Sequence, residues 1–152
     1  MIFRFVVRKL RWLGAIPLLP QIFDATLLAL TALTAPRKLR GIQLLENAVQ
    51  RKLGAKLGGH RFGGTGFYVG GVELGHVHGN GLLDVLVGRQ NRDAVVSSGR
   101  AFFHHVFPAS GWVSFWIRNP GDVKRGIELL RLANEKVTRG KRCSRMSSAN
   151  IA

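Results

Sequence analysis

The sequence predicts an α+β domain built on an antiparallel sheet of about five strands, with elements in the order α-α-β-β-β-α-β-β-α. Three observations lead to this prediction. Helix-like segments open and close the 152-residue chain, short extended runs lie between them, and tight glycine-containing turns join several of those runs. Turns this short connect neighbouring antiparallel strands, whereas a doubly wound sheet needs a helix after each strand.

Residues 1–40 are predicted to form a basic and apolar helical extension. Pro17 and Pro20 interrupt its apolar part, so the longest uninterrupted helix runs over 21–35. Such a helix spans about 22 Å, less than the roughly 30 Å hydrocarbon core of a bilayer. We expect an amphipathic helix that packs on the domain or on a membrane surface, with a membrane span or cleaved signal as the alternative. Its polar residues fall on one side of the helical wheel: Gln21, Asp24, Thr31 and Thr34.

The main domain is predicted over 41–138. Its first helix is expected at 38–57, ended by Gly58-Gly59, and three strands follow between residues 60 and 87. A short helix then begins at Asn91 and closes at Gly99. The buried stripe of the first helix comprises Ile42, Leu45, Val49 and Leu53.

Two further strands are predicted in AFFHHVF (101–107) and GWVSFWIR (111–118). The sequence Asn119-Pro120-Gly121-Asp122 is typical of a helix start, because it offers a capping side chain, a proline and then an acid. From Arg139 onward the chain is polar and basic, so residues 139–152 are expected to be a disordered tail.

Charge is concentrated at the two ends of the chain. The formal net charge is +15, and residues 1–40 hold seven Lys/Arg against one acid, while 136–152 hold five and no acid. Basic ends attract anionic surfaces without reading sequence, which makes an anionic membrane surface a candidate partner and a specific nucleic-acid site unexpected. The expected location is cytoplasmic or peripheral to a membrane. The lone cysteine, Cys143, offers neither a disulfide framework nor a metal knuckle.

The segment VELGHVHGNGLLDV (72–85) brings chemistry-bearing residues into one predicted hairpin. If Gly79-Asn80-Gly81 is a three-residue turn, His78 pairs with Leu82 and His76 lies opposite Asp84. Opposed residues share a face at about 4.5–5.5 Å between Cβ atoms. His76, His78 and Asp84 are therefore expected to converge, whereas Glu73 has the other parity and faces away unless a bulge intervenes.

Three uses of this group stay open. A carboxylate beside an imidazole raises its basicity and gives a general base. Two imidazoles and a carboxylate also suit a divalent metal with open coordination positions. The structural alternative is an ordinary His–Asp hydrogen bond on a half-exposed sheet face.

A second histidine pair, His104-His105, lies in the next predicted hairpin. If residues 108–111 form its loop, His105 pairs with Ser114 and shares a face with Trp112 and Trp116, whereas His104 takes the other face. An aromatic face that is not core suits a binding platform, or a bed for the N-terminal helices.

A recognisable combination is formed by GGTGFYVGGVELGHVHGNGLLDV (63–85), HHVFPASGWVSFWIR (104–118) and the closing helix. Over 62–136 the chain resembles the luciferase-like domain family, which includes the fungal luciferases and many short bacterial proteins of unknown role. The two quoted segments are similar to the bacterial members. The fungal enzymes share fewer features: an acid three residues before an HxH pair, a later Gly-x4-His, a Trp-containing strand and a C-terminal helix.

This resemblance implies an oxygenase that adds molecular oxygen to a small enolic or aromatic substrate without a cofactor such as flavin or haem. Deprotonation of an enolic hydroxyl gives an electron-rich anion that oxygen can attack. The implied catalytic candidates are Glu73, His76, His78 and His104, joined by Asp84 from the hairpin, and the candidate substrate-binding residues are His105, Trp112 and Trp116. The alternative is a non-catalytic domain that binds a small ligand or metal and is held at a membrane surface.

Overall fold

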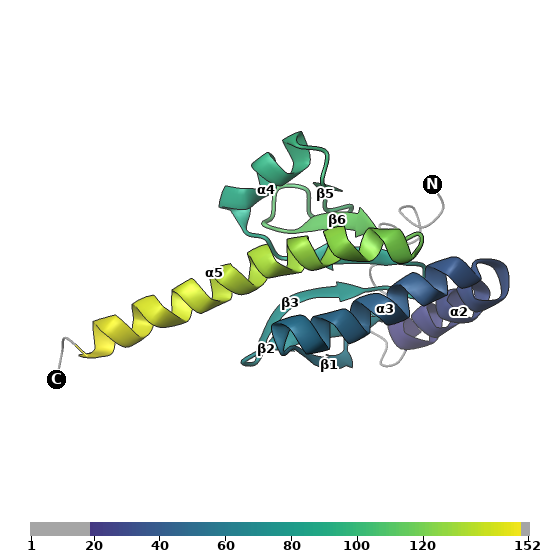
Figure 1. Cartoon of the computed structure of the whole chain (residues 1–152), viewed down its shortest axis with the longest axis horizontal. Coiled ribbons are helices and arrows are strands. Elements are labelled where there is room, and N and C mark those ends of the chain that lie inside the picture. The colour runs from purple at the N-terminus through teal and green to yellow at the C-terminus, as the bar shows by residue number, and fades with distance from the viewer. Residues whose placement is uncertain (1–18, 150–152) are drawn as a thin grey trace.

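The computed structural model describes the backbone of residues 19–149 and the side chains of residues 19–140. It contains a six-stranded antiparallel sheet in the order β1-β2-β3-β4-β6-β5. Helices α3 and α5 lie side by side over one face of this sheet (Figure 1). The predicted α+β class is confirmed, with one strand more than expected.

Two helices precede the sheet, α2 (Leu19–Thr34) and α3 (Pro36–Leu53). Pro36 stands at the start of α3, where a proline needs no hydrogen-bond partner for its nitrogen. The predicted end of this helix at residue 57 is wrong. Gly54 adopts a left-handed conformation (φ 63°) and its N–H caps the carbonyl of Gln50, which ends the helix. The next residues form β1 (Lys56–Gly59), the strand that sequence analysis missed.

The three strands predicted between residues 60 and 87 are present as β2 (Thr65–Val69), β3 (Val72–Val77) and β4 (Leu82–Val85). The predicted turn between β3 and β4 is also confirmed. The His78 N–H donates to Leu82 O at 2.9 Å, and His76 pairs with Asp84.

A bulge in β3 changes which side chains reach the histidine face. Phe67 pairs with Gly75, but the next residue, Tyr68, pairs with Glu73, so Leu74 is an extra residue in β3. Leu74 turns into the core, where its side chain is fully buried. The same bulge places Glu73 beside His76, as the sequence analysis expected only if a bulge intervened.

The region after β4 differs most from expectation. Helix α4 (Arg89–Ser97) begins after Gly88, and Asn91 donates to Val87 O within it instead of capping it. The predicted strand over 101–107 is reduced to β5 (Phe102–Phe103), which pairs with β6 (Val113–Trp116).

The predicted register of this second hairpin is also wrong. Phe102, not His105, pairs with Ser114. Because the chain leaves the sheet after Phe103, His104 and His105 no longer alternate between two faces.

The closing helix starts as predicted. Asn119 accepts a hydrogen bond from Gly121 N at 2.8 Å, and the carboxylate of Asp122 accepts from Asn119 N at 3.1 Å, which forms a capping box over η2 (Pro120–Asp122). Helix α5 then runs over Val123–Ala149, so the disordered tail expected from residue 139 is wrong for 139–149. After Pro120 the sequence contains no proline that would end the helix earlier.

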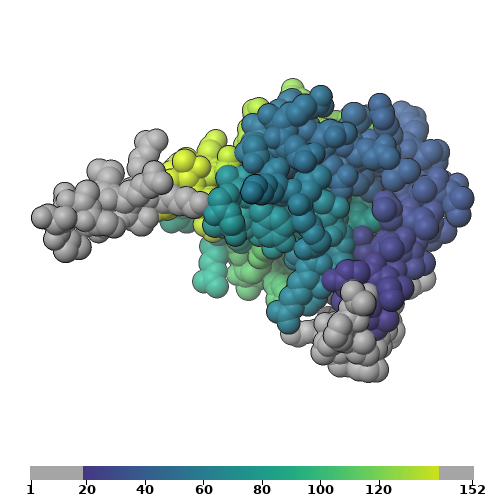
Figure 2. All heavy atoms as spheres, turned by 90° about the horizontal axis from the view of Figure 1, so that it is seen from below, coloured from purple at the N-terminus to yellow at the C-terminus, as the bar shows by residue number. Residues whose placement is uncertain are grey.

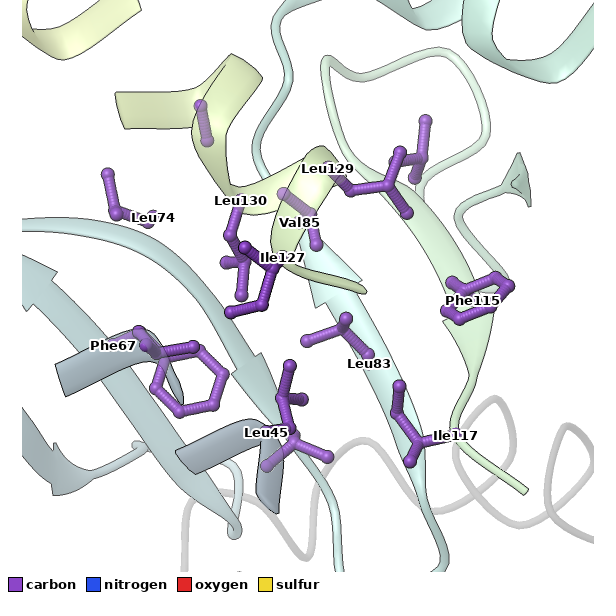
Figure 3. Close-up of a cluster of buried hydrophobic side chains, with 14 of the residues drawn as sticks. Leu45, Phe67, Leu74, Leu83, Val85, Phe115, Ile117, Ile127, Leu129 and Leu130 are labelled. Atoms are coloured by element: carbon purple, nitrogen blue, oxygen red, sulfur yellow. The ribbon is translucent and has the colours of Figure 1, made fainter. Parts of the chain in front are cut away.

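The apolar core lies between the sheet and the helix pair α3 and α5 (Figure 3). Leu45 from α3 and Leu130 from α5 are fully buried there, over Leu83 and Val85 of β4 and Ile117 after β6. Since one face of each strand supplies this core, the alternate residues of β3, β4 and β6 face away from it. Those alternate residues carry the polar cluster described below.

Part of the polar side of helix α2 is turned inward, while Gln21 and Thr34 at its two ends are exposed. Asp24 and Thr31 are buried, 8% and 5% exposed, whereas Leu33 is 84% exposed. Its other apolar residues that reach the surface are Ile22, Phe23, Leu28 and Leu30, and Figure 2 shows the atoms of this helix at the surface of the molecule. Within residues 19–149, no helix combines the length and apolar character needed to cross a membrane.

Candidate active site

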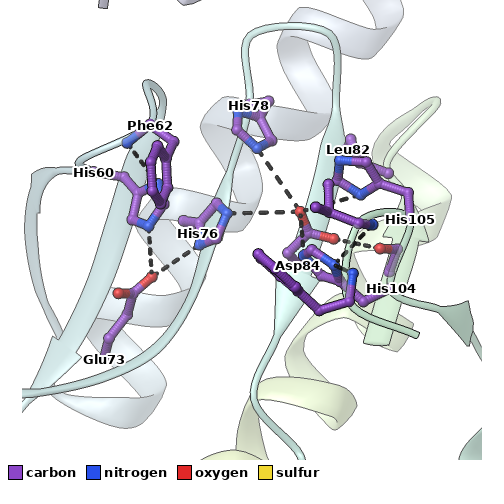
Figure 4. Close-up of polar contacts among 12 residues, drawn as sticks. His60, Phe62, Glu73, His76, His78, Leu82, Asp84, His104 and His105 are labelled. Carbon is purple, nitrogen blue, oxygen red and sulfur yellow. Dashed lines mark hydrogen bonds and ion pairs between the residues drawn. The ribbon is translucent and has the colours of Figure 1, made fainter. Parts of the chain in front are cut away.

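The five histidines of the chain gather around two carboxylates, Glu73 and Asp84, on the sheet face opposite the core (Figure 4). Four of them surround one oxygen atom, Oδ2 of Asp84. The nitrogens nearest to this oxygen are His76 Nε2 at 3.6 Å, His78 Nε2 at 3.8 Å, His104 Nε2 at 3.6 Å and His105 Nδ1 at 3.9 Å.

Asp84 is the centre of the cluster. Its side chain is 1% exposed, and Oδ1 accepts a short hydrogen bond from the Ser114 hydroxyl of the neighbouring strand β6. Oδ2 is buried and makes no hydrogen bond with the side chains and backbone of residues 19–140. Burial raises the pKa of this carboxyl to about 6, although the hydrogen bond from Ser114 opposes the rise.

His76 is held by Glu73. The Nδ1 atom of His76 lies 2.8 Å from Glu73 Oε1, and His60 Nε2 lies 3.4 Å from the same oxygen. The His60 and His76 rings stack with their centroids 3.6 Å apart. Burial, followed by the nearby imidazoles, lowers the pKa of His76 to about 3, and burial lowers that of His60 to about 4. Both rings are therefore neutral at pH 7.

His78 is held by helix α2. Its Nδ1 atom lies 3.3 Å from Asp24 Oδ1, and the same oxygen accepts the Gly79 N–H at 2.9 Å. Asp24 lies more than 50 residues before these partners in the sequence. Its carboxylate therefore ties α2 to the turn of the β3–β4 hairpin.

His104 receives hydrogen bonds from the backbone of its own loop. Its Nδ1 atom accepts the N–H groups of Val106 at 3.1 Å and Phe107 at 3.0 Å. A neutral imidazole that accepts at Nδ1 carries its proton on Nε2, which is the atom facing Asp84. Burial, then the neighbouring His105, lowers the pKa of His104 to about 3.

Aromatic side chains border the cluster on one side. The ring of Trp112 lies 5.4 Å from that of His76 and 6.1 Å from that of His104, and Phe107 stacks on His104 at 5.6 Å. On the α2 side, a cavity of about 190 Å³ reaches the cluster at His78.

One comparison with known proteins identifies the segment that carries this site. The family model described as Luciferase domain matches residues 71–133. This segment matches the luciferase-like domain family. The match confirms the family resemblance inferred from sequence. No curated protein and no solved structure matches the chain significantly.

The matched segment brings most of the predicted site residues together. The catalytic candidates Glu73, His76, His78, Asp84 and His104 form one connected set of contacts. Their catalytic roles stay predictions.

The three predicted substrate-binding residues are placed differently from one another. His105 reaches Asp84 and Trp112 borders His76. Trp116 pairs with Leu82, two strand positions from the Asp84–Ser114 pair, on the same face.

Two contributors lie outside the matched segment and were not predicted as site residues. Asp24 sits in α2, where a lone carboxylate in an apolar helix was a usable signal because buried charges need partners. His60 precedes β2, and its position depends on the pairing of β1 with β2, which the sequence did not reveal.

Three sets of side chains place ligand atoms close enough for a metal ion. Each set offers one nitrogen or oxygen atom per residue, with all atoms within 4.8 Å of one another. The sets are His60, Glu73 and His76; His76, His78 and Asp84; and Asp84, His104 and His105.

Proposed function

We propose that this protein is an oxygenase that oxidises a small enolic or phenolic substrate with molecular oxygen at the histidine cluster. The observation that carries the proposal is the convergence of His76, His78 and His104 on buried Asp84, beside Trp112 and within the luciferase-like domain. Buried carboxylates with raised pKa values are typical of sites that move protons.

Proton removal is the first step that this cluster suits. With its pKa raised to about 6, Asp84 is a stronger base than His76 and His104, whose pKa values are lowered to about 3. Asp84 takes the proton of the substrate hydroxyl, and the O–H electron pair stays on the substrate as an enolate. The enolate carbon then forms a bond to molecular oxygen and supplies two electrons to it, which gives a peroxide anion. This anion takes the proton back from Asp84 and becomes a hydroperoxide. The flat ring of Trp112 packs against the planar substrate.

Oxygen consumption tests this function. Purified protein is offered a panel of enolic and phenolic compounds, and Asp84→Asn, His76→Ala and His78→Ala are compared with the unchanged protein. Asp93→Asn is the matched control, because Asp93 is exposed and pairs only with its neighbour Arg92 among the contacts described. We expect Asp84→Asn to lower the rate at least about 100-fold, the usual contribution of a positioned base. Equal rates in all variants contradict the proposal.

A second proposed role concerns α2, and its inverted orientation supports it. Apolar side chains point outward over its length, and basic Arg37 and Arg40 are exposed at the start of α3. An apolar surface next to basic residues suits an anionic membrane, because apolar burial and charge attraction add. We propose that this helix docks on anionic lipid.

Vesicle flotation tests the membrane role. Leu30→Glu combined with Leu33→Glu should reduce binding to phosphatidylserine vesicles by about tenfold or more, given roughly 1.5–3 kcal/mol for each buried leucine. Val72→Glu, at an exposed apolar position on β3, is the control and should bind like the unchanged protein. Identical binding of both variants, or equal binding to neutral phosphatidylcholine vesicles, removes this proposal.

A further inference from the structure

The carboxylate contacts of two hairpin histidines show which of their ring nitrogens faces Asp84. A carboxylate accepts hydrogen bonds, so the Nδ1 atom of His76, 2.8 Å from Glu73 Oε1, carries a proton. The Nδ1 atom of His78, 3.3 Å from Asp24 Oδ1, carries one for the same reason. The Nε2 atoms of both rings face Asp84 Oδ2.

Three possible metal-ligand atoms converge in a buried space. His76 Nε2 and His78 Nε2 lie 3.6 and 3.8 Å from Asp84 Oδ2, and this oxygen makes no hydrogen bond with residues 19–140. A buried carboxylate oxygen that lacks a hydrogen bond is unfavourable at low dielectric, and a cation bound beside it would remove this cost.

We propose that His76 Nε2, His78 Nε2 and Asp84 Oδ2 bind a divalent first-row transition metal. Two imidazoles and one carboxylate on one side of an ion, with positions left open, are the donor set of non-haem iron oxygenases and related metal sites. With bonds of about 2.0–2.2 Å, neighbouring ligand atoms lie about 3.0–3.4 Å apart. Each of the two nitrogens therefore needs to move toward Asp84 Oδ2 by several tenths of an ångström.

The surroundings of the two histidines match those of metal ligands. A metal-bound histidine usually donates its second ring N–H to a carboxylate or carbonyl, which fixes the tautomer and the ring orientation. Glu73 serves His76 in this way and Asp24 serves His78. Ser114 fixes the third ligand by donating to the other oxygen of Asp84.

The other two candidate sets are less suitable. His104 accepts two backbone N–H groups at Nδ1, so its Nε2 atom carries a proton and has no lone pair for a metal. His60 accepts the Phe62 N–H at its own Nδ1, so its Nε2 carries the ring proton and lies 3.4 Å from Glu73 Oε1. Glu73 Oε1 thus already faces ring N–H groups from two sides. His104 is a positioning residue, whose N–H faces Asp84 Oδ2.

A metal here would deepen the proposed function, but its detection does not depend on that function. A bound divalent ion lowers the pKa of a hydroxyl that coordinates it, so it would replace Asp84 as the agent that removes the substrate proton. Oxygen consumption that survives complete chelation leaves the proposed function standing and overturns the metal site for catalysis. Metal binding without oxygen consumption supports the metal site and leaves the proposed oxygenase function without support.

The test is metal binding by the full chain, carrying no histidine tag. Protein treated with chelator and dialysed is titrated with Co²⁺ and Zn²⁺, followed by cobalt d–d absorption and by elemental analysis. We expect one ion per chain, displaced by chelator. Asp84→Asn, which is isosteric, and His76→Ala should each weaken binding by more than about 100-fold, beyond the 10- to 100-fold typical of outer residues.

Two further variants test the ligand assignment. Glu73 and His104 contact the proposed ligands but do not bind the metal themselves. Glu73→Gln and His104→Gln should therefore each weaken Co²⁺ binding by about 10- to 100-fold or less. The exposed control Asp93→Asn should bind like the unchanged protein. Circular dichroism of each metal-free variant identifies any that fails to fold. The inference is overturned if the unchanged protein binds less than half an ion per chain, or if Asp84→Asn binds Co²⁺ as tightly as Asp93→Asn.

Discussion

Gly79 lies where helix α2 makes its closest approach to the site, and adding one methyl group there should loosen both. A Cβ atom at Gly79 would lie 2.6 Å from the backbone atoms Asp24 O and Leu28 N of α2. Contacts this short are not tolerated, so α2 has to withdraw by about 0.5–1 Å to restore ordinary packing. The backbone of Gly79 is not in the left-handed region, so alanine meets no conformational strain of its own.

The magnitude follows from the bonds that this movement stretches. Asp24 Oδ1 accepts Gly79 N at 2.9 Å and lies 3.3 Å from His78 Nδ1. Hydrogen bonds to charged groups contribute about 1.5–3 kcal/mol each, and the longer of the two contributes least. We therefore expect Gly79→Ala to lower the free energy of unfolding by about 2–4 kcal/mol.

Urea unfolding followed by far-ultraviolet circular dichroism measures this change. Gly59→Ala is the matched control, because no atom lies within 4 Å of a Cβ built at Gly59 and its φ is not positive. The control also accounts for the entropy that any Gly→Ala change removes from the unfolded chain. If the two variants unfold within 0.5 kcal/mol (about a third of one hydrogen bond to a charged group) of each other, α2 is not held against the hairpin as described.

Three further predictions concern pH, the core and a helix cap. In chelator-treated protein, stability should fall by about 2 kcal/mol or more from pH 7 to 5, because the buried rings of His76 and His104 keep pKa values of about 3 while their unfolded values are near 6.5. The raised pKa of Asp84 acts in the opposite direction below pH 6 but is a single group, so a rise in stability on acidification would contradict the burial of neutral imidazoles. Leu45→Ala, at a fully buried position, should cost about 2–5 kcal/mol in urea unfolding, and a loss below 1 kcal/mol would place this side chain outside the core. Asn119→Ala should cost about 1 kcal/mol by removing the cap of η2, with Asn119→Asp as the variant that keeps the cap.

The hairpin that contains His76, His78 and Asp84 could be predicted from sequence because every contact in it is local. The three-residue turn fixes the register, and the register fixes which side chains oppose one another. Glu73 shows the limit of this reasoning. The bulge at Leu74 in β3 moves the side chain of Glu73 to the face that carries His76. The sequence allows such a bulge but does not indicate that it occurs.

The second histidine pair shows a different limit. Regular alternation over 101–107 placed His104 and His105 on opposite faces, yet both reach Asp84, because the strand ends at Phe103 and the chain bends. Where a strand ends depends on how far its partner β6 can pair with it, which local propensity does not determine.

The amino-acid sequence alone determined the fold class, the helix start at Asn119, the first histidine hairpin and the family to which residues 71–133 correspond. These depend on turn residues, periodicity and motifs that act over a few positions. Only the tertiary structure brought Asp24 to His78 and His60 to Glu73. Those contacts join segments separated by many residues, so their existence depends on how whole elements pack, and no local pattern in the chain encodes that packing by itself.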